Sequence, residues 1–167
     1  MNQYVAYVLQ KLEEQKIVLT EDQKQDIEIA DFGLKDFEHY GLGIYTYVNN
    51  DLYCAKELVM LPNQICPEHR HPEVGSYKGK QETFRCRQGI VDLYVDMDGE
   101  ETVEIDSSSN YTSRTKIRLY PGQQFTIPRN TKHWFQAGPE GAIVSEFSST
   151  SIDEADIFTD KNIKRVE

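Results

Sequence analysis

The most constraining feature of this sequence is a series of short, β-rich segments that begins at about Gly41. Tyrosine, valine, isoleucine and threonine dominate the segments, and turn residues such as Asp98-Gly99 and Pro121-Gly122 separate them. A spacing of roughly ten residues per strand favours an antiparallel sandwich or barrel. The expected strands are Gly43–Val48, Tyr53–Leu61, Gln81–Cys86, Ile90–Asp96, Thr102–Ile105, Lys116–Tyr120, Gln124–Pro128, His133–Ala137 and Ala142–Phe147.

The two ends of the chain follow other patterns. Residues 1–16 carry apolar side chains at helical spacing, and Thr20 with Gln23 fits a capping box that predicts a second helix ending near Ile29. The polar stretch after residue 148 predicts a short helix and a tail folded across the barrel. We therefore expect a single domain over residues 1–167, with a helical segment at 1–40, a β-barrel at 41–148 and a C-terminal tail at 149–167.

Composition excludes several classes of function. The formal net charge is −10, which repels phosphate backbones, so we expect no nucleic-acid partner. The three cysteines form no C-x-x-C pair, which indicates free thiols in a reducing compartment. The N-terminus does not read as a signal peptide, and no apolar run reaches membrane-spanning length, so we expect a cytoplasmic protein without a membrane partner.

Histidines supply the first chemical signal. In His69-Arg70-His71 two imidazoles lie two residues apart, and on a strand such residues point to the same face. Two neutral imidazoles that converge in this way are the start of a metal site. His39 stands isolated in a polar stretch, so we interpret it as a surface residue.

These histidines belong to a pattern that resembles the two motifs of the cupin superfamily. The first motif is matched by His69-x-His71 and by Glu82-x6-Gly89, with a longer gap than usual between them and with Asn63 at the opening glycine position. In the second, Gly122, Pro128 and His133 match in register, Asn130 replaces a glycine and Ala137 an asparagine. The resemblance covers about residues 55–148. It implies an all-β, jelly-roll antiparallel barrel with the N-terminal helices packed outside.

The cupin pattern implies one divalent metal held by His69, His71, Glu82 and His133. Because of the long gap, Glu73 is a second candidate for the carboxylate ligand, but Glu82 lies on an expected strand that would hold it rigidly. Three nitrogen donors and one carboxylate suit Mn²⁺, Fe²⁺, Co²⁺ or Zn²⁺ better than Ca²⁺ or Mg²⁺.

Further segments resemble the bacterial D-lyxose ketol-isomerases, a family of cupins. They are Gly79–Arg85, Val144–Ser148 and the tail Asp153–Asp160 with Arg165. The resemblance implies interconversion of D-lyxose and D-xylulose, with D-mannose and D-fructose as a second pair, supported by Mn²⁺.

Ketol isomerisation also needs a group that moves a proton between C1 and C2. Glu146 is the candidate base, because strand parity and the family resemblance both bring it towards the pocket. Lys80 lies two residues before Glu82 and is expected to face the same cavity, where it would support or protonate an oxygen of the intermediate. Asp156 and Arg165 are weaker candidates for contacts to the sugar. Trp134 and Phe135 adjoin a ligand histidine, and we expect one of them to line the pocket, with Trp134 as the candidate, and the other to pack in the core.

Two rival functions stay open at the level of sequence. The same ligands suit an Fe(II)-dependent cupin dioxygenase, and a non-catalytic sugar-binding cupin would need no base. A cupin sheet with an exposed edge often pairs with a second copy, so we expect a homodimer.

Overall fold

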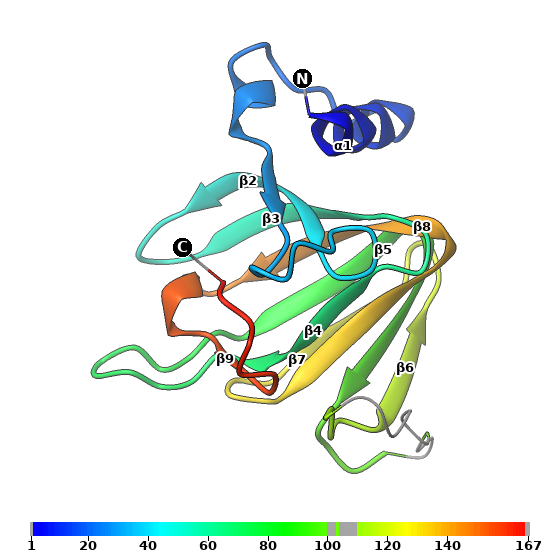
Figure 1. Cartoon of the computed structure of the whole chain (residues 1–167). Coiled ribbons are helices and arrows are strands. Elements are labelled where there is room, and N and C mark those ends of the chain that lie inside the picture. The colour runs from blue at the N-terminus through cyan, green and yellow to red at the C-terminus, as the bar shows by residue number, and fades with distance from the viewer. Residues whose placement is uncertain (1, 100–102, 104–109, 166–167) are drawn as a thin grey trace.

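The computed structural model describes residues 2–99, 103 and 110–165 (Figure 1). Within these residues, nine strands form one antiparallel sheet that curls into a cupin-like half-barrel, which confirms the predicted fold class. The strands are β1 (Glu28–Ala30), β2 (Leu42–Asn49), β3 (Cys54–Met60), β4 (Ile65–Arg70), β5 (Glu82–Val95), β6 (Thr115–Leu119), β7 (Gln124–Ile127), β8 (His133–Ser148) and β9 (Ile157–Phe158).

The sheet runs in the order β1-β2-β3-β8-β4-β9, and β5 pairs with β6, β7 and β8. The strand β8 has three partners in the sheet. Its first half pairs with β4 and its second half with β3, while β5 pairs with it along most of its length. The main core fills the concave side and includes Leu58, Phe84, Phe135 and Val144. The strands β4 and β5 therefore both pair with the first half of β8.

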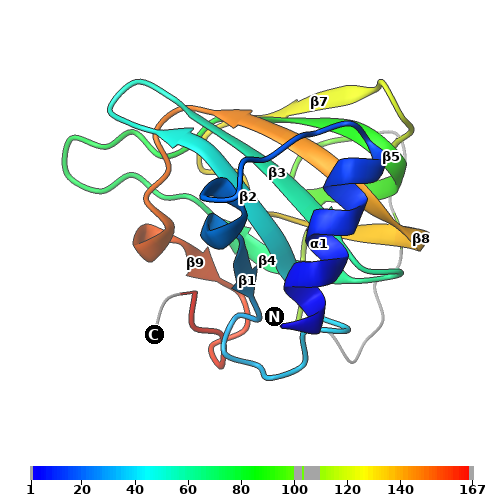
Figure 2. The same cartoon turned by 90° about the horizontal axis from the view of Figure 1, so that it is seen from above.

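Among the described residues, the one α-helix lies outside the sheet. Helix α1 (Gln3–Glu14) begins at Asn2, whose side chain accepts a hydrogen bond from the Tyr4 amide. Its buried residues Val8 and Leu12 pack on the outer face of the sheet, against Val59 and Ile143. Figure 2 shows α1 lying across β2 and β3 from above. No helix of the described chain is both long and apolar enough to cross a membrane.

The predicted second helix is wrong beyond its first turn. The capping box does form, since Thr20 and Gln23 exchange two hydrogen bonds of 2.9 and 3.3 Å. However, the chain makes only a 3-10 turn at Gln23–Asp26 and then enters β1. Because the apolar residues of this stretch alternate instead of recurring at helical spacing, β1 can join the edge of the sheet, and residues 1–40 are only partly helical.

Other differences concern strand boundaries. The expected strands Gln81–Cys86 and Ile90–Asp96 are one strand, β5, and His133–Ala137 and Ala142–Phe147 are one strand, β8. The strands β4 and β9 were not among the expected strands. The expected strand Thr102–Ile105 lies, apart from Val103, outside the described residues. The tail contains a 3-10 turn at Asp153–Ala155, and β9 pairs with β4.

Two glycines make the merged strands possible. Gly89 (φ +74°) and Gly141 (φ +78°) sit where β5 and β8 bend together, next to a register shift. A Cβ atom on Gly89 would lie 2.1 Å from the carbonyl oxygen of Gly141. Only glycine fits both the backbone conformation and this close approach.

This crossing yields a prediction about stability. We expect Gly89→Ala to lower the free energy of unfolding by about 2–5 kcal/mol, because the cost of the strained backbone adds to the cost of the steric overlap. Gly122→Ala is the matched control, because Gly122 also has positive φ but a Cβ there meets nothing within 4 Å. We expect this variant to lose only about 1–2 kcal/mol in the free energy of unfolding. Urea unfolding measures both, and equal losses would contradict the packing explanation.

Candidate active site

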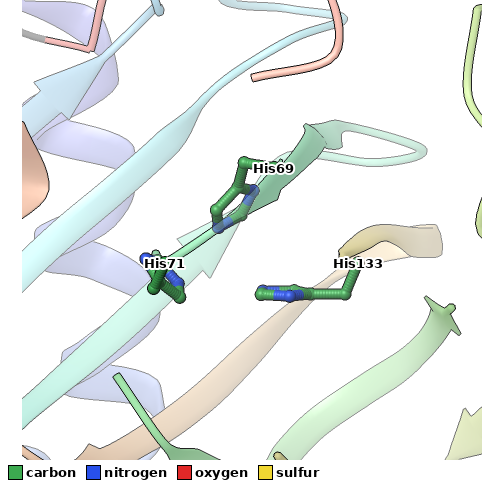
Figure 3. Close-up of side chains that lie close together, drawn as sticks. All are labelled: His69, His71 and His133. Atoms are coloured by element: carbon green, nitrogen blue, oxygen red, sulfur yellow. The ribbon is translucent and has the colours of Figure 1, made fainter. Parts of the chain in front are cut away.

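Three histidines come together where the end of β4 pairs with the start of β8. His69 on β4 stands directly opposite His133 on β8 in the strand register, and His71 follows on the same side. All three are buried, and each offers a ligand atom within 4.8 Å of those of the other two. Figure 3 shows the three rings turned towards one another. These residues can hold a metal ion.

The outer nitrogen of each ring is already occupied. Nδ1 of His69 lies 2.7 Å from the Pro67 carbonyl oxygen, and Nδ1 of His133 lies 2.9 Å from that of Thr131. Carbonyl oxygens only accept hydrogen bonds, so both Nδ1 atoms carry the proton. Nδ1 of His71 lies 2.5 Å from Asp156 Oδ1, which fixes that ring in the same way. With Nδ1 engaged in this way, Nε2 is the ring nitrogen that each histidine can offer to a metal, which is the usual arrangement in metalloproteins.

The fully buried carboxylate of Glu82 lies beside two of these nitrogens. Its Oε1 is 2.9 Å from Nε2 of His133 and 3.2 Å from Nε2 of His71. The buried Nε2 of His133 nevertheless makes no hydrogen bond. Two ligand atoms bound at about 2.0–2.2 Å and at right angles lie about 3 Å apart, so the spacing suits shared coordination. Glu73, the other candidate ligand, is exposed to solvent.

Burial and neighbouring charges together set the pKa values of the residues in this cluster. Burial and the charges of His133 and His71 hold the pKa of His69 well below its usual range. Burial also opposes protonation of His71, but the Glu82 charge and the Asp156 hydrogen bond outweigh it and raise the His71 pKa to about 9. Burial would raise the pKa of Glu82, yet Lys80 and the histidines hold it well below its usual range. The donor set thus fits a divalent metal ion.

Lys80 and Glu146 extend the cluster into the cavity. The Lys80 ammonium lies 2.7 Å from Glu82 Oε2 and 2.6 Å from Glu146 Oε1, and all three side chains are buried. Burial opposes the charge of Lys80, but Glu146 and Glu82 outweigh it and keep the Lys80 pKa well above its usual range. Lys80 is therefore a fixed cation between Glu82 and Glu146, and Glu146 lines the same cavity as His69 and His71.

These groups line one cavity together with apolar side chains such as Leu58 and Phe84, the mixed lining that is typical of small-molecule sites. Asp156 and Arg165 both line it, as expected from the sequence. Trp134 does not: it stacks on Tyr94 with ring centroids 3.8 Å apart, and its indole N–H bonds the Ser113 carbonyl oxygen. Since neighbouring residues of a strand point to opposite faces, Phe135 lines the cavity in its place.

Sequence reasoning did not name Lys56 as a residue of the cavity, and it gave Asp153 only as part of the tail segment Asp153–Asp160. Lys56 comes from β3 and Asp153 from the 3-10 turn of the tail. A signal for Lys56 did exist, because on its strand it shares a face with the apolar residues Cys54, Leu58 and Met60. His39, interpreted as a surface residue, is exposed and contacts Asp36 at 2.7 Å.

Comparison with known proteins agrees with this geometry. A family model described as D-lyxose isomerase matches residues 1–167. The D-lyxose ketol-isomerase of Thermofilum sp. (strain ex4484_79) is 57% identical over 164 residues, covering 95% of this chain and 90% of that protein. The D-lyxose/D-mannose isomerase of Thermosediminibacter oceani is 56% identical over 165 residues, covering 95% and 90%.

Solved structures support the fold. The L-ribose isomerase of Acinetobacter sp. DL28, in complex with L-ribose, superposes with a TM-score of 0.77 at 15% identity, covering 97% of this chain and 92% of that one. The L-ribose isomerase of Cellulomonas parahominis with L-ribose gives a TM-score of 0.76 at 14% identity, covering 97% and 92%. Taken with the match to the family over residues 1–167, the identity to its named members shows that this chain belongs to the D-lyxose isomerase family and is an aldose–ketose isomerase.

Proposed function

We propose that this enzyme interconverts D-lyxose and D-xylulose, with D-mannose and D-fructose as a second pair, and that it depends on one divalent metal, Mn²⁺. His69, His71, His133 and Glu82 would hold the metal. The observation that carries the proposal is the buried row Glu82–Lys80–Glu146, in which Lys80 joins the proposed ligand Glu82 to a second carboxylate outside the proposed ligand set. The names of the relatives support the choice of sugars.

The roles of the residues follow from their positions. A bound divalent metal supplies a Lewis acid that polarises the sugar carbonyl. Glu146 removes the proton from C2 of the aldose and returns it to C1, while a proton passes from O2 to O1. Lys80 holds Glu146 in place and offers positive charge where the intermediate is negative. Asp156 fixes the His71 ring, so it acts through a ligand and not on the sugar.

An aldose panel tests this function. We expect the manganese-loaded enzyme to form D-xylulose from D-lyxose in anaerobic buffer, and chelation followed by Mn²⁺ to abolish and restore turnover. Ketose is measured by chromatography. Oxygen consumption with another substrate and no ketose would favour the rival dioxygenase, and sugar binding without turnover would favour the rival binding protein.

Three expectations from sequence stay predictions: one domain over residues 1–167, a cytoplasmic location and a homodimer. The sheet order ends at β1 and β9, so edge strands for pairing with a second copy are present.

A further inference from the structure

The cavity continues past Glu146 to charged groups that the proposed reaction does not use. Lys56 on β3 is the register partner of Glu146 on β8, and both side chains line the cavity. Residues directly opposite in an antiparallel pair have Cβ atoms about 4.5–5.5 Å apart. The Lys56 side chain therefore starts next to the proposed base, on a strand that carries none of the metal ligands.

Lys56 reaches from there towards the tail. Its Nζ lies 3.3 and 3.4 Å from the two carboxylate oxygens of Asp153. The same carboxylate accepts shorter hydrogen bonds from Ser151 (2.6 Å) and Arg165 (2.8 Å). Asp153 is thus held in place by other groups, and the tail that carries it is fixed to β4 through β9.

The buried ammonium of Lys56 is incompletely satisfied. It has three N–H donors, and good N–H···O bonds measure about 2.7–3.2 Å. Among the described residues, its hydrogen bonds are the two long contacts to one carboxylate. A side chain that is 6% exposed and keeps donor capacity inside a cavity suits a polar ligand.

We propose that Lys56 and Asp153 form a subsite for the hydroxyl groups of the sugar beyond C3, and that this subsite determines how strongly the enzyme prefers pentoses and hexoses over shorter aldoses. The inference rests on the proposed function, which places C1 and C2 between the metal and Glu146. The rest of an open-chain sugar then extends along the cavity. An ammonium donor beside a carboxylate acceptor matches vicinal hydroxyls, each of which donates and accepts.

Chain length of the substrate gives a sharp test. Lys56→Met keeps the aliphatic stem and removes the donors. We expect kcat/KM for D-lyxose to fall about 10–10²-fold, mainly through KM, because the lost contact is made equally in the ground and transition states. For L-glyceraldehyde, which has the C2 configuration of D-lyxose but ends at C3, we expect a change below about threefold. Asp153→Asn should show the same pattern.

Competitive inhibition measures the same contact without chemistry. D-Arabinitol, the alditol obtained by reducing D-lyxose, should inhibit Lys56→Met about 10-fold less strongly than wild type. The matched control is Lys116→Met, which removes a similar contact, 3.4 Å from Asp92, on β6. We expect it to leave both measurements unchanged.

Two outcomes separate the inference from the proposed function. Equal losses on D-lyxose and L-glyceraldehyde, with unchanged inhibition by D-arabinitol, would mean that Lys56 only anchors the tail, and would overturn the subsite. Failure of wild type to isomerise any aldose would instead overturn the proposed function.

Discussion

Changing Glu146 to Gln should leave the metal and the fold intact and lower kcat by about 10²–10⁴-fold, the usual worth of general acid–base catalysis. The amide keeps the shape of the side chain but cannot take a proton from carbon. Lys80 is a poor substitute, because its two carboxylate neighbours keep it protonated. The ligand Glu82 is also unsuitable, since coordination to a cation lowers its basicity.

The matched control for this variant is Glu57→Gln. Glu57 is as buried as Glu146, at 4% exposure each, but it lies on the other face of β3, where Ser145 donates to both of its oxygens. We expect it to keep near wild-type turnover. Metal content by elemental analysis and D-lyxose turnover are measured on the same samples. A fully metallated Glu146→Gln enzyme with normal turnover would move the base to another residue, such as one of the tail Asp153–Asp160.

The second large effect is expected at the metal. We predict that His133→Ala loses bound Mn²⁺ and at least about 10³-fold in turnover, because the Lewis acid supplies several kcal/mol of stabilisation to the reaction. His133 is fully buried, and its Nε2 lies 2.9 Å from Oε1 of the proposed ligand Glu82. Removing the ring opens the cluster at its most enclosed ligand.

His39→Ala is the control for loss of a histidine as such, since His39 is exposed and pairs with Asp36. It should retain metal and turnover. If His133→Ala binds one equivalent of Mn²⁺ with unchanged affinity, the ligand assignment is wrong. Glu82→Gln then distinguishes a three-histidine site from one that includes the carboxylate.

Much of the fold could be predicted because its signals are local. The alternation of apolar and polar residues fixed most strands, and the two asparagines that replace motif glycines do adopt positive φ, 60° at Asn63 and 55° at Asn130. The long strands β5 and β8 were each read as two, because Gly89 and the Gly138–Gly141 stretch look like turns. In the structure they bend strands without ending them.

The missed elements depend on distant partners. Strand β4 carries Pro67, Glu68 and His69, so it has little apolar pattern of its own. Buried Glu68 is satisfied there by the amides of Thr112 and Ser113 and the hydroxyl of Thr159, all far away in sequence. Strand β9 has two residues and exists because β4 offers it an edge.

The sequence predicted the central residues of the site better than the residues at its periphery. The sequence motifs led to the three histidines that the structure brings together, and strand parity placed Glu146 and Lys80 in the cavity. Parity also argues against Trp134, because its neighbour His133 already faces inward. The Lys56–Asp153 contact joins a strand and a tail that no local pattern relates.

The most direct test of the proposed mechanism traces the proton that moves from C2 of the aldose to C1 of the ketose. Manganese-loaded enzyme is incubated with D-lyxose in anaerobic D₂O until equilibrium, and the products are examined by NMR. Transfer through the Glu146 carboxylate allows exchange with solvent, so we predict D-xylulose that carries deuterium at C1. D-Xylulose without any deuterium would contradict a proton shuttle, and no D-xylulose at all would contradict the proposed isomerisation.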